Sequence, residues 1–358
     1  MVGLDHRTGD KIMHKLGIIG YGGMAGYHVK QLKEYERLTV KGIYDVNPER
    51  EVVAVKNGLI AYPSKEALLE DQEIDIVLIA TTNEVHKELA IEALRAGKHV
   101  ICEKPVTMNS EELLEIMAVE KETGNFFTIN QNRRTNKDFV LMRRSVEQGL
   151  IGQPYVIESR VEGSRGMPKG WRTIKALGGG MMLDWGVHLI DQLMYMIPEK
   201  VVDVYCKMYN IEYPEVDDNF RLILTFESGL TAQIEVSTNN YITHPRWHVL
   251  GKDGTLQIDN WDCDGKIVRC IDKENVWEDE IVYTKAGPTK TMAPRRSESI
   301  EELTLSEPMD VVDSITVVYD NLIDAIEGKA PLTITSAQAL EVMKVMERAF
   351  RCQELHRC

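Results

Sequence analysis

The sequence predicts an α/β protein in which an N-terminal, doubly wound, parallel Rossmann sheet is followed by a C-terminal α/β domain with an open, mostly antiparallel sheet. Three observations lead to this prediction. The chain has 358 residues, about twice the usual domain length. Its first third alternates apolar runs with amphipathic helical segments. Beyond residue 150, half-buried strands follow one another with hairpin signals between them. We place the domains at 1–135 and 136–358, with the last helices able to pack back on the first domain.

The elements of the first domain follow from short apolar runs and helix stop signals. Gly97 and Gly124 come directly after helical periodicity and are typical helix stops. Strand–helix–strand repetition with short connections indicates a parallel sheet. The predicted strands are 16–19, 38–44, 74–80, 98–102 and 126–130, and the predicted helices are 24–32, 84–95 and 111–123.

The second half of the chain alternates apolar and polar residues, as strands with one buried face do. Ser228-Gly229 and 252–254 supply hairpin turns. Segment 285–308 holds three prolines and little periodicity, so we predict a long loop there. The predicted strands are 155–160, 201–208, 220–226, 230–237, 247–250 and 255–258, and the predicted helices are 183–196, 311–327 and 336–353.

Composition limits the class of partner. Hydrophobic residues make up 43% of the chain and charged residues 27%, while the formal net charge is −14. Such an acidic chain is a poor candidate for binding nucleic-acid backbone. Apolar runs are strand-sized, residues 1–15 are polar, and the six cysteines form no C-x-x-C pair. We therefore expect a cytoplasmic protein with reduced thiols, without a nucleic-acid or membrane partner.

A glycine-rich turn follows the first predicted strand and opens the first predicted helix. Gly20 allows the tight turn, Gly22 lets a pyrophosphate approach the backbone, and Ala25 keeps the helix close to the sheet. The helix N-terminus offers unpaired N–H groups to phosphates. The whole motif reads Gly20-Tyr21-Gly22-Gly23-Met24-Ala25.

The end of the second predicted strand identifies the cofactor more closely. Asp45 stands where a carboxylate can bind both ribose hydroxyls and repel a 2′-phosphate, and Val46-Asn47 supplies no arginine. These residues favour NAD over NADP. The alternative is a glycine turn with a helix-capping aspartate on a sheet that binds no nucleotide.

A second constellation lies on the predicted helix 183–196. Asp184, His188 and Asp191 share one face of it, and three glycines at 178–180 precede it. Oxidation of an alcohol needs a base for the hydroxyl proton and a cation for the developing alkoxide. His188 suits the first role, and Lys104, directly after a Rossmann strand, suits the second. Asp184 would fix a substrate hydroxyl or hold Lys104 and His188 in place.

Three alternatives compete with this catalytic interpretation. Asp184 and His188 could bind a divalent metal, although the sequence shows no further cluster with ligand spacing, so we predict no metal. The same face could be a hydrogen-bonded core network. Lys104 could be a surface lysine, but the rigid Pro105 beside it argues against this alternative.

These motifs together resemble the Gfo/Idh/MocA oxidoreductases, a family that includes inositol dehydrogenases and other sugar dehydrogenases. The resemblance runs from about Leu16 to the last helix. The motifs are, in order, Gly20-x-Gly22-x-x-Ala25-x-x-His28, Thr81-Thr82-Asn83-x-x-His86, Glu103-Lys104-Pro105 and Gly178-Gly179-Gly180-x-x-x-Asp184-x-Gly186-x-His188-x-x-Asp191.

The resemblance implies roles for several residues. It makes Lys104, Asp184 and His188 the catalytic lysine, aspartate and histidine. It also implies that the C-terminal sheet forms a subunit interface, so we expect a homodimer or homotetramer. Thr82 departs from the proline of many members, which leaves that loop less rigid. The resemblance places four further residues along NAD, namely Thr81, Asn83, His86 and Glu103.

The substrate site is expected at Asn132-Arg133 and at Trp171-Arg172, together with Asp184 and His188. An aromatic face and an arginine fork suit hydroxyl-rich or carboxylated sugars. The alternative is that Trp171 is core and Arg172 pairs with a cofactor phosphate or an acidic side chain.

Four hypotheses of function remain open. The first is NAD-dependent oxidation of a ring hydroxyl of a sugar, glycoside or inositol to a ketone. The second is a glucoside 3-dehydrogenase that keeps and recycles its NAD. The third is a non-catalytic NAD-sensing regulator, and the fourth is an NAD-dependent glycoside hydrolase.

Overall fold

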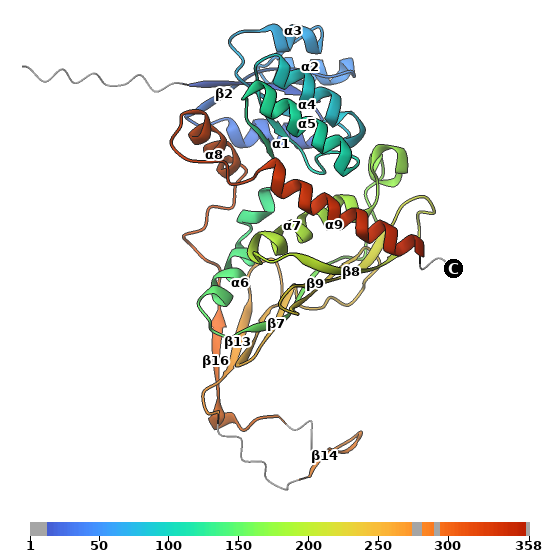
Figure 1. Cartoon of the computed structure of the whole chain (residues 1–358), viewed down its shortest axis with the longest axis vertical. Helices are drawn as coiled ribbons and strands as arrows, with labels where there is room; N and C mark the ends of the chain where they lie inside the picture. Colours follow the sequence, from blue (N-terminus) through green and yellow to red (C-terminus); the bar gives the residue numbers. More distant parts are fainter. Residues whose placement is uncertain (1–12, 274–280, 290–293, 356–358) are drawn as a thin grey trace, which may run out of the picture.

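The computed structural model of the chain describes residues 13–273, 281–289 and 294–355. It divides into a Rossmann layer and a large sheet, with α9 (Ser336–Leu355) running between them (Figure 1). Residues 1–12 lie outside the described part.

The Rossmann sheet is six-stranded and parallel throughout, in the order β3-β2-β1-β4-β5-β6. The predicted doubly wound sheet is confirmed. The order reverses between β1 and β4, which is where such sheets bind their ligands. The strands are β1 (His14–Ile19), β2 (Leu38–Tyr44), β3 (Ile60–Ala61), β4 (Ile76–Ile79), β5 (His99–Cys102) and β6 (Phe127–Ile129).

Local capping explains most of the Rossmann helices. Asn47, Ser64 and Asn109 each accept a backbone hydrogen bond at a helix N-terminus, and Gly124 ends its helix in the left-handed region at φ 71°. The prediction missed two short helices and the two-residue β3. The helices are α1 (Gly23–Leu32), α2 (Pro48–Lys56), α3 (Lys65–Glu70), α4 (His86–Arg95) and α5 (Ser110–Thr123).

The second sheet has eight strands in the order β16-β13-β12-β11-β7-β10-β9-β8. Only the pair β7 and β10 is parallel, so the predicted mostly antiparallel sheet is confirmed. The strands are β7 (Pro154–Glu162), β8 (Val201–Tyr209), β9 (Asn219–Phe226), β10 (Thr231–Ser237), β11 (Trp247–Gly251), β12 (Gly254–Ile258), β13 (Gly265–Cys270) and β16 (Ile300–Leu305).

The described parts of segment 285–308, residues 285–289 and 294–308, do not form the long loop that we predicted, and residues 290–293 lie outside the described part. Residues Ile300–Leu305 form β16 and pair with β13, while β15 (Gly287–Thr289) pairs with β14 (Val282–Thr284). In β16, Leu303 and Leu305 pack against the main core. Two successive glutamates, Glu301 and Glu302, interrupt the alternation of apolar and polar residues that would have indicated a strand. Residues 300–305 therefore form a strand because they pair with β13, which is distant in the chain, although their local sequence pattern does not indicate a strand.

The C-terminal helices connect the two layers. The predicted helix 311–327 begins later, as α8 (Thr316–Ile326), where Ser314 Oγ accepts from the Thr316 N–H. In α8, Tyr319 and Leu322 join the core around β1 of the Rossmann sheet. α9 packs on β8 and against α5 and α7 (Val187–Met196), so both α7 and α9 lie on one face of the large sheet (Figure 1).

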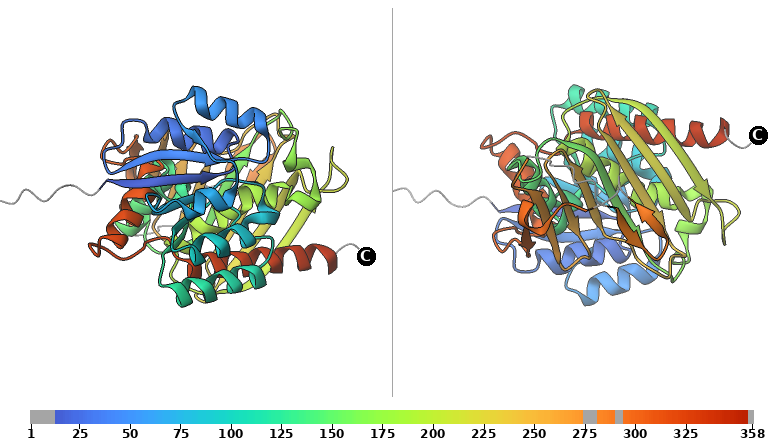
Figure 2. Two further views of the ribbon diagram at one scale, coloured as in Figure 1. Left: turned by 90° about the horizontal axis from the view of Figure 1, so that it is seen from above. Right: turned by 90° about the horizontal axis from the view of Figure 1, so that it is seen from below.

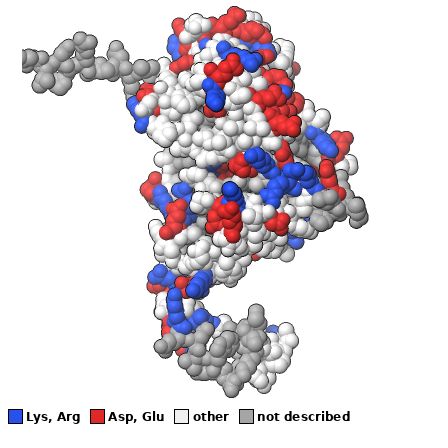
Figure 3. Space-filling view, viewed as in Figure 1, with Lys and Arg blue, Asp and Glu red and all other residues white. Residues whose placement is uncertain are grey.

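The opposite face of the large sheet is open to the viewer in the view from below in Figure 2. The side of the molecule in Figure 3 mixes acidic and basic side chains over both layers. No helix in the described ranges is both long and apolar enough to cross a bilayer.

Candidate active site

A large cavity lies between the carboxyl ends of the Rossmann strands and the C-terminal domain. Its volume is about 1520 Å³, above the roughly 300–1,000 Å³ of a typical single-ligand pocket. It therefore has room for a dinucleotide and a second molecule. Most of the predicted site residues line it: Gly20, Gly22, Gly23, Met24, Asp45, Thr81, Asn83, Glu103, Lys104, Asn132, Arg133, Trp171, Arg172, Asp184 and His188.

The glycine turn fits a pyrophosphate. Gly20 has φ +88°, and a Cβ there would lie 2.7 Å from the Ala80 carbonyl oxygen, so only glycine suits this position. A Cβ on Gly22 or Gly23 would meet nothing within 4 Å, which leaves the approach open. α1 begins without a side-chain cap, so its first N–H groups are available to phosphate oxygens. Ala25 is fully buried against the sheet instead of lining the cavity.

Asp45 is held at the end of β2 by two backbone donors. Its Oδ2 accepts from the Tyr21 N–H at 2.6 Å and its Oδ1 from the Asn47 N–H at 2.8 Å. The carboxylate also lines the cavity, as a ribose ligand must. Arg50 in α2 and Lys65 in α3 line the same cavity, and both were missed because their helices were not predicted.

Asp184 joins two cations at the other end of the cavity. The Lys104 ammonium donates to Asp184 Oδ1 at 2.9 Å and to the Asp184 carbonyl oxygen at 2.7 Å. Arg172 Nε donates to Asp184 Oδ2 at 2.8 Å. Burial alone would raise the pKa of Asp184, but the charges of Lys104 and Arg172 outweigh it and lower that pKa. Asp184 is thus an anion that holds Lys104 toward the cavity.

This arrangement decides between the alternatives for 171–172. Arg172 pairs with an acidic side chain, as the second interpretation proposed. Trp171 is half-buried and lines the cavity, so it is not part of the core.

The helix that carries Asp184 is not α-helical from its start. Met182–Gly186 form a π-helical turn, and the α-helix begins at Val187. Such wider turns interrupt α-helices frequently at functional sites. Here the turn carries Asp184 to Lys104, while His188 lies on the α-helical part that follows.

His188 is buried and hydrogen-bonded by a residue that the sequence analysis did not single out. Its Nδ1 lies 3.2 Å from Gln131 Oε1. Because an amide oxygen only accepts, Nδ1 carries the proton and Nε2 keeps its lone pair. Burial, with the positive charges of Lys104 and Arg133, holds the pKa of His188 well below the ordinary histidine value. The imidazole is therefore neutral at pH 7 and can accept a proton.

Asp191, the third member of the shared helix face, forms a buried ion pair. Arg134 Nε donates to Asp191 Oδ2 at 2.7 Å and Arg134 Nη2 to Oδ1 at 2.6 Å. Both side chains are buried. This bidentate pair anchors α7 to the segment after β6, so Asp191 positions the helix and does not line the cavity.

His86 and Glu103 support the loops around the cavity. His86 is buried outside the lining, and its Nδ1 lies 3.0 Å from the Pro105 carbonyl oxygen, next to Lys104. Glu103 lines the cavity and accepts from Asn130 Nδ2 at 2.8 Å, while His28 Nε2 lies 2.9 Å from the same oxygen. His28 and Glu103 thus connect α1 to the strand end that carries Lys104.

The glycine run before the helix allows close approach of two side chains. A Cβ on Gly178 would lie 2.4 Å from Asn83 Nδ2, and one on Gly180 would lie 2.3 Å from Asp217 Oδ1. Asn83 Nδ2 donates to the Gly178 carbonyl oxygen at 3.1 Å. The run therefore connects the loop at Asn83, which follows β4, to the helix of His188.

Asp217 is buried at the start of this helix, and its Oδ2 accepts from the Met182 N–H at 2.7 Å. Burial raises the pKa of Asp217 to about 7. The pKa of Asp217 is higher in the folded chain than in the unfolded chain. Its contribution to the free energy of unfolding is therefore complete at pH values below the unfolded pKa, and it is lost as the pH rises through the folded pKa of about 7. We expect the free energy of unfolding to fall by roughly 2–4 kcal/mol between pH 4 and pH 8 for this reason.

Asp217→Asn removes this titratable group. The difference in free energy of unfolding between the variant and the wild type should therefore change between pH 4 and pH 8. Urea unfolding at several pH values measures it. Asp203→Asn, at an exposed site of β8, is the control and should follow the wild type. Parallel curves for Asp217→Asn and wild type would contradict the expectation.

Among the described residues, no group of three or more histidine, cysteine or acidic side chains is placed to hold a metal ion. The cysteines of the described ranges are free thiols.

Comparisons with known proteins agree with this geometry. Residues 14–131 match the model of an oxidoreductase family with an NAD-binding Rossmann fold, and residues 139–257 match the GFO/IDH/MocA C-terminal domain. The chain is 29% identical to myo-inositol 2-dehydrogenase of Thermotoga maritima over 257 residues, which covers 69% of this chain and 75% of the relative. It is 30% identical to 1,5-anhydro-D-fructose reductase of Ensifer adhaerens over 252 residues, covering 68% and 75%.

A solved structure is similar over nearly the full length. The crystal structure of an NAD-binding protein from Listeria innocua is 43% identical in sequence. It covers 97% of this chain and 99% of its own, with a TM-score of 0.92.

Proposed function

Because the chain belongs to the GFO/IDH/MocA family of NAD-binding oxidoreductases, we propose that it is an NAD-dependent dehydrogenase that oxidises a ring hydroxyl of a sugar, glycoside or inositol to a ketone. The observation that carries the proposal is the placement of His188 and Lys104 in the cavity that also contains the glycine turn. Two relatives named for inositol and 1,5-anhydro-D-fructose support a polyhydroxylated ring as substrate.

The residues of the chain divide the chemistry between them. When bound, the nicotinamide supplies the hydride acceptor or donor. His188 takes the hydroxyl proton at Nε2 during oxidation and returns it during reduction. The Lys104 ammonium donates a hydrogen bond to the same oxygen as negative charge develops there. Asp184 holds Lys104, and Gln131 holds the imidazole of His188.

The experiment is a substrate panel. Purified protein with NAD is offered inositols, free hexoses and glucosides, and the near-ultraviolet absorbance of NADH is followed. The proposal fails if no member of the panel gives NADH and no exchange occurs between sugar and keto-sugar. Release of nucleotide on denaturation identifies the version in which NAD stays bound between turnovers.

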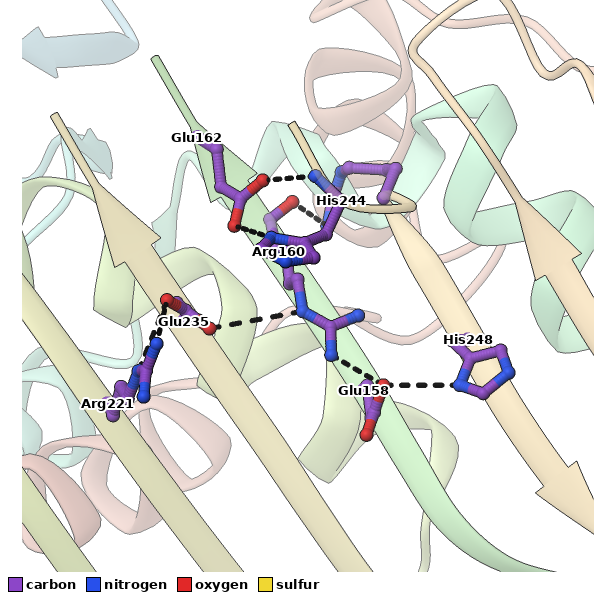
Figure 4. Close-up of polar contacts among 8 residues, drawn as sticks. Glu158, Arg160, Glu162, Arg221, Glu235, His244 and His248 are labelled. Carbon is purple, nitrogen blue, oxygen red and sulfur yellow. Dashed lines mark hydrogen bonds and ion pairs between the residues drawn. The ribbon is translucent and has the colours of Figure 1, made fainter. Parts of the chain in front are cut away.

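We further propose that the open face of the large sheet joins two copies of the chain. Acidic and basic side chains on the neighbouring strands β7, β9, β10 and β11 form hydrogen bonds and ion pairs across this face (Figure 4). Arg160 donates to Glu158 at 2.6 Å, and Arg221 pairs with Glu235 at 2.9 Å. A shallow cavity of about 530 Å³ lies on the same face. Charges of both signs on one open sheet face suit self-complementary contact across a two-fold axis.

We expect a dimer or tetramer by light scattering. Arg160→Glu places an acid among Glu158 and Glu235 and should lower the molar mass toward that of one chain. Lys30→Glu, exposed on α1, is the matched charge reversal and should keep the wild-type mass. A wild-type mass of one chain would contradict the proposal.

A further inference from the structure

The end of the cavity around His188 holds more positive than negative charge. Lys104 and Arg172 share the single carboxylate of Asp184, and Arg133 adds a third cation to the same lining. Three cations therefore face two carboxylates, Asp184 and Glu103, of which Glu103 also pairs with His28. This excess stands out in a chain with a formal net charge of −14.

Arg133 is the cation in this group without a carboxylate partner among the described residues. Its Nη1 donates to the neutral amide oxygen of Asn136 at 3.1 Å, and its Nε is buried without a hydrogen-bond partner. The acidic residues that act on it, chiefly Asp138 and Asp184, do so through longer-range charge and outside ion-pair distance. Burial lowers the pKa of Arg133, yet a guanidinium keeps its proton in proteins.

An aromatic ring fixes the guanidinium beside the acid–base residue. The Arg133 guanidinium carbon lies 4.0 Å from the centre of the Trp185 ring. Trp185 in turn contacts His188 edge-on, with ring centres 6.2 Å apart. The charge of Arg133 is close enough to lower the pKa of His188. Arg133 is thus held next to the place where the ring hydroxyl must lie.

The phosphates of the cofactor are not the natural partner of this guanidinium. Their turn follows β1, whereas Arg133 follows β6, and β4 and β5 lie between these strands. Three strand spacings correspond to roughly 14 Å. A half-buried cation without a counterion is costly, and a planar anion can accept two parallel hydrogen bonds from a guanidinium.

We propose that the substrate carries an anionic group, a carboxylate or a phosphate, that Arg133 binds while His188 and Lys104 act on a neighbouring ring hydroxyl. This inference deepens the proposed function and rests on it. It makes the substrate a sugar acid or sugar phosphate and Arg133 the residue that selects it over a neutral sugar.

The test compares one ring with and without its charge: D-glucose, D-glucuronate and D-glucose 6-phosphate. We expect kcat/KM for one of the charged sugars to exceed that for glucose by on the order of 100-fold. Arg133→Gln should reduce this ratio to within a few-fold of one, and Arg133→Lys should keep part of it. Arg143→Gln is the matched control, because Arg143 is also half-buried and stacks on Tyr195.

A binding measurement separates this inference from the proposed function. Calorimetric titration of the protein with glucuronate and with glucose 6-phosphate, with and without NADH, detects the anion without turnover. Binding that Arg133→Gln weakens about 100-fold supports the inference even if no panel member is oxidised, in which case only the proposed function fails. Equal kcat/KM for glucose and both charged sugars, or equal loss of all three in Arg133→Gln, overturns the inference and leaves the dehydrogenase standing.

Discussion

Replacing His188 with alanine is expected to lower kcat for oxidation by about 100- to 10,000-fold, because the variant lacks the base that takes the hydroxyl proton. Binding of NADH, which we propose to depend on the glycine turn and Asp45, should change little. Steady-state kinetics and fluorescence titration with NADH measure the two effects. A variant that keeps more than roughly a tenth of wild-type kcat would show that another group removes the proton.

The pH dependence gives this prediction an independent check. Because the pKa of His188 is held well below its ordinary value, the base stays deprotonated at neutral and mildly acidic pH. We expect wild-type kcat/KM for oxidation to be level through that range and to fall only at lower pH, as His188 gains its proton.

Gln131→Ala keeps the imidazole but removes the acceptor at Nδ1. It should show a smaller loss of kcat together with a shifted acid limb, because Gln131 positions His188 and does not itself react. A loss of stability without a shifted limb would assign Gln131 a structural role only.

Replacing Lys104 with methionine is expected to lower kcat and kcat/KM together, by about 100- to 1,000-fold in both directions. In the proposed mechanism the ammonium stabilises charge that develops on the reacting oxygen, so its loss should affect the transition state more than the bound substrate. Methionine has a similar length and fills the half-buried site, whose other members Asp184 and Arg172 can still pair.

Two controls make the Lys104 result interpretable. Lys104→Arg keeps the charge but changes its geometry at Asp184, so its activity should lie between wild type and Lys104→Met. Lys87→Met removes a surface lysine that pairs with Glu115, away from the cavity, and should behave as wild type. A Lys104→Met variant with raised KM and unchanged kcat would reduce Lys104 to a binding residue.

Much of the fold could be predicted from local patterns. The strands 16–19, 38–44 and 98–102 and the helix before Gly124 are close to the observed β1, β2, β5 and α5, because each is a short apolar or amphipathic run with its own stop signal. β13 and β16 were missed, since their order comes from pairing: β16 is the edge strand and pairs with β13, which also pairs with β12. Strand formation there depends on a partner distant in the chain.

The sequence by itself determined the chemical groups of the site. The glycine turn, Asp45 and Lys104 were each placed at a strand end, His188 was placed on one face of a predicted helix, and the cavity contains them all. This worked because ligands of doubly wound sheets collect at the carboxyl ends of the strands, whichever residues lie between. Local order along the chain therefore determined which side chains share the cavity.

Only the tertiary structure decided what each group does there. On one helix face, Asp184 meets Lys104, His188 meets Gln131 and Asp191 meets Arg134, and only the first two line the cavity. These partners lie in the segments that follow β5 and β6, 57 or more residues away in the chain. Periodicity places residues on a face, but burial, the partner and the charge come from distant segments that meet only when the domains pack.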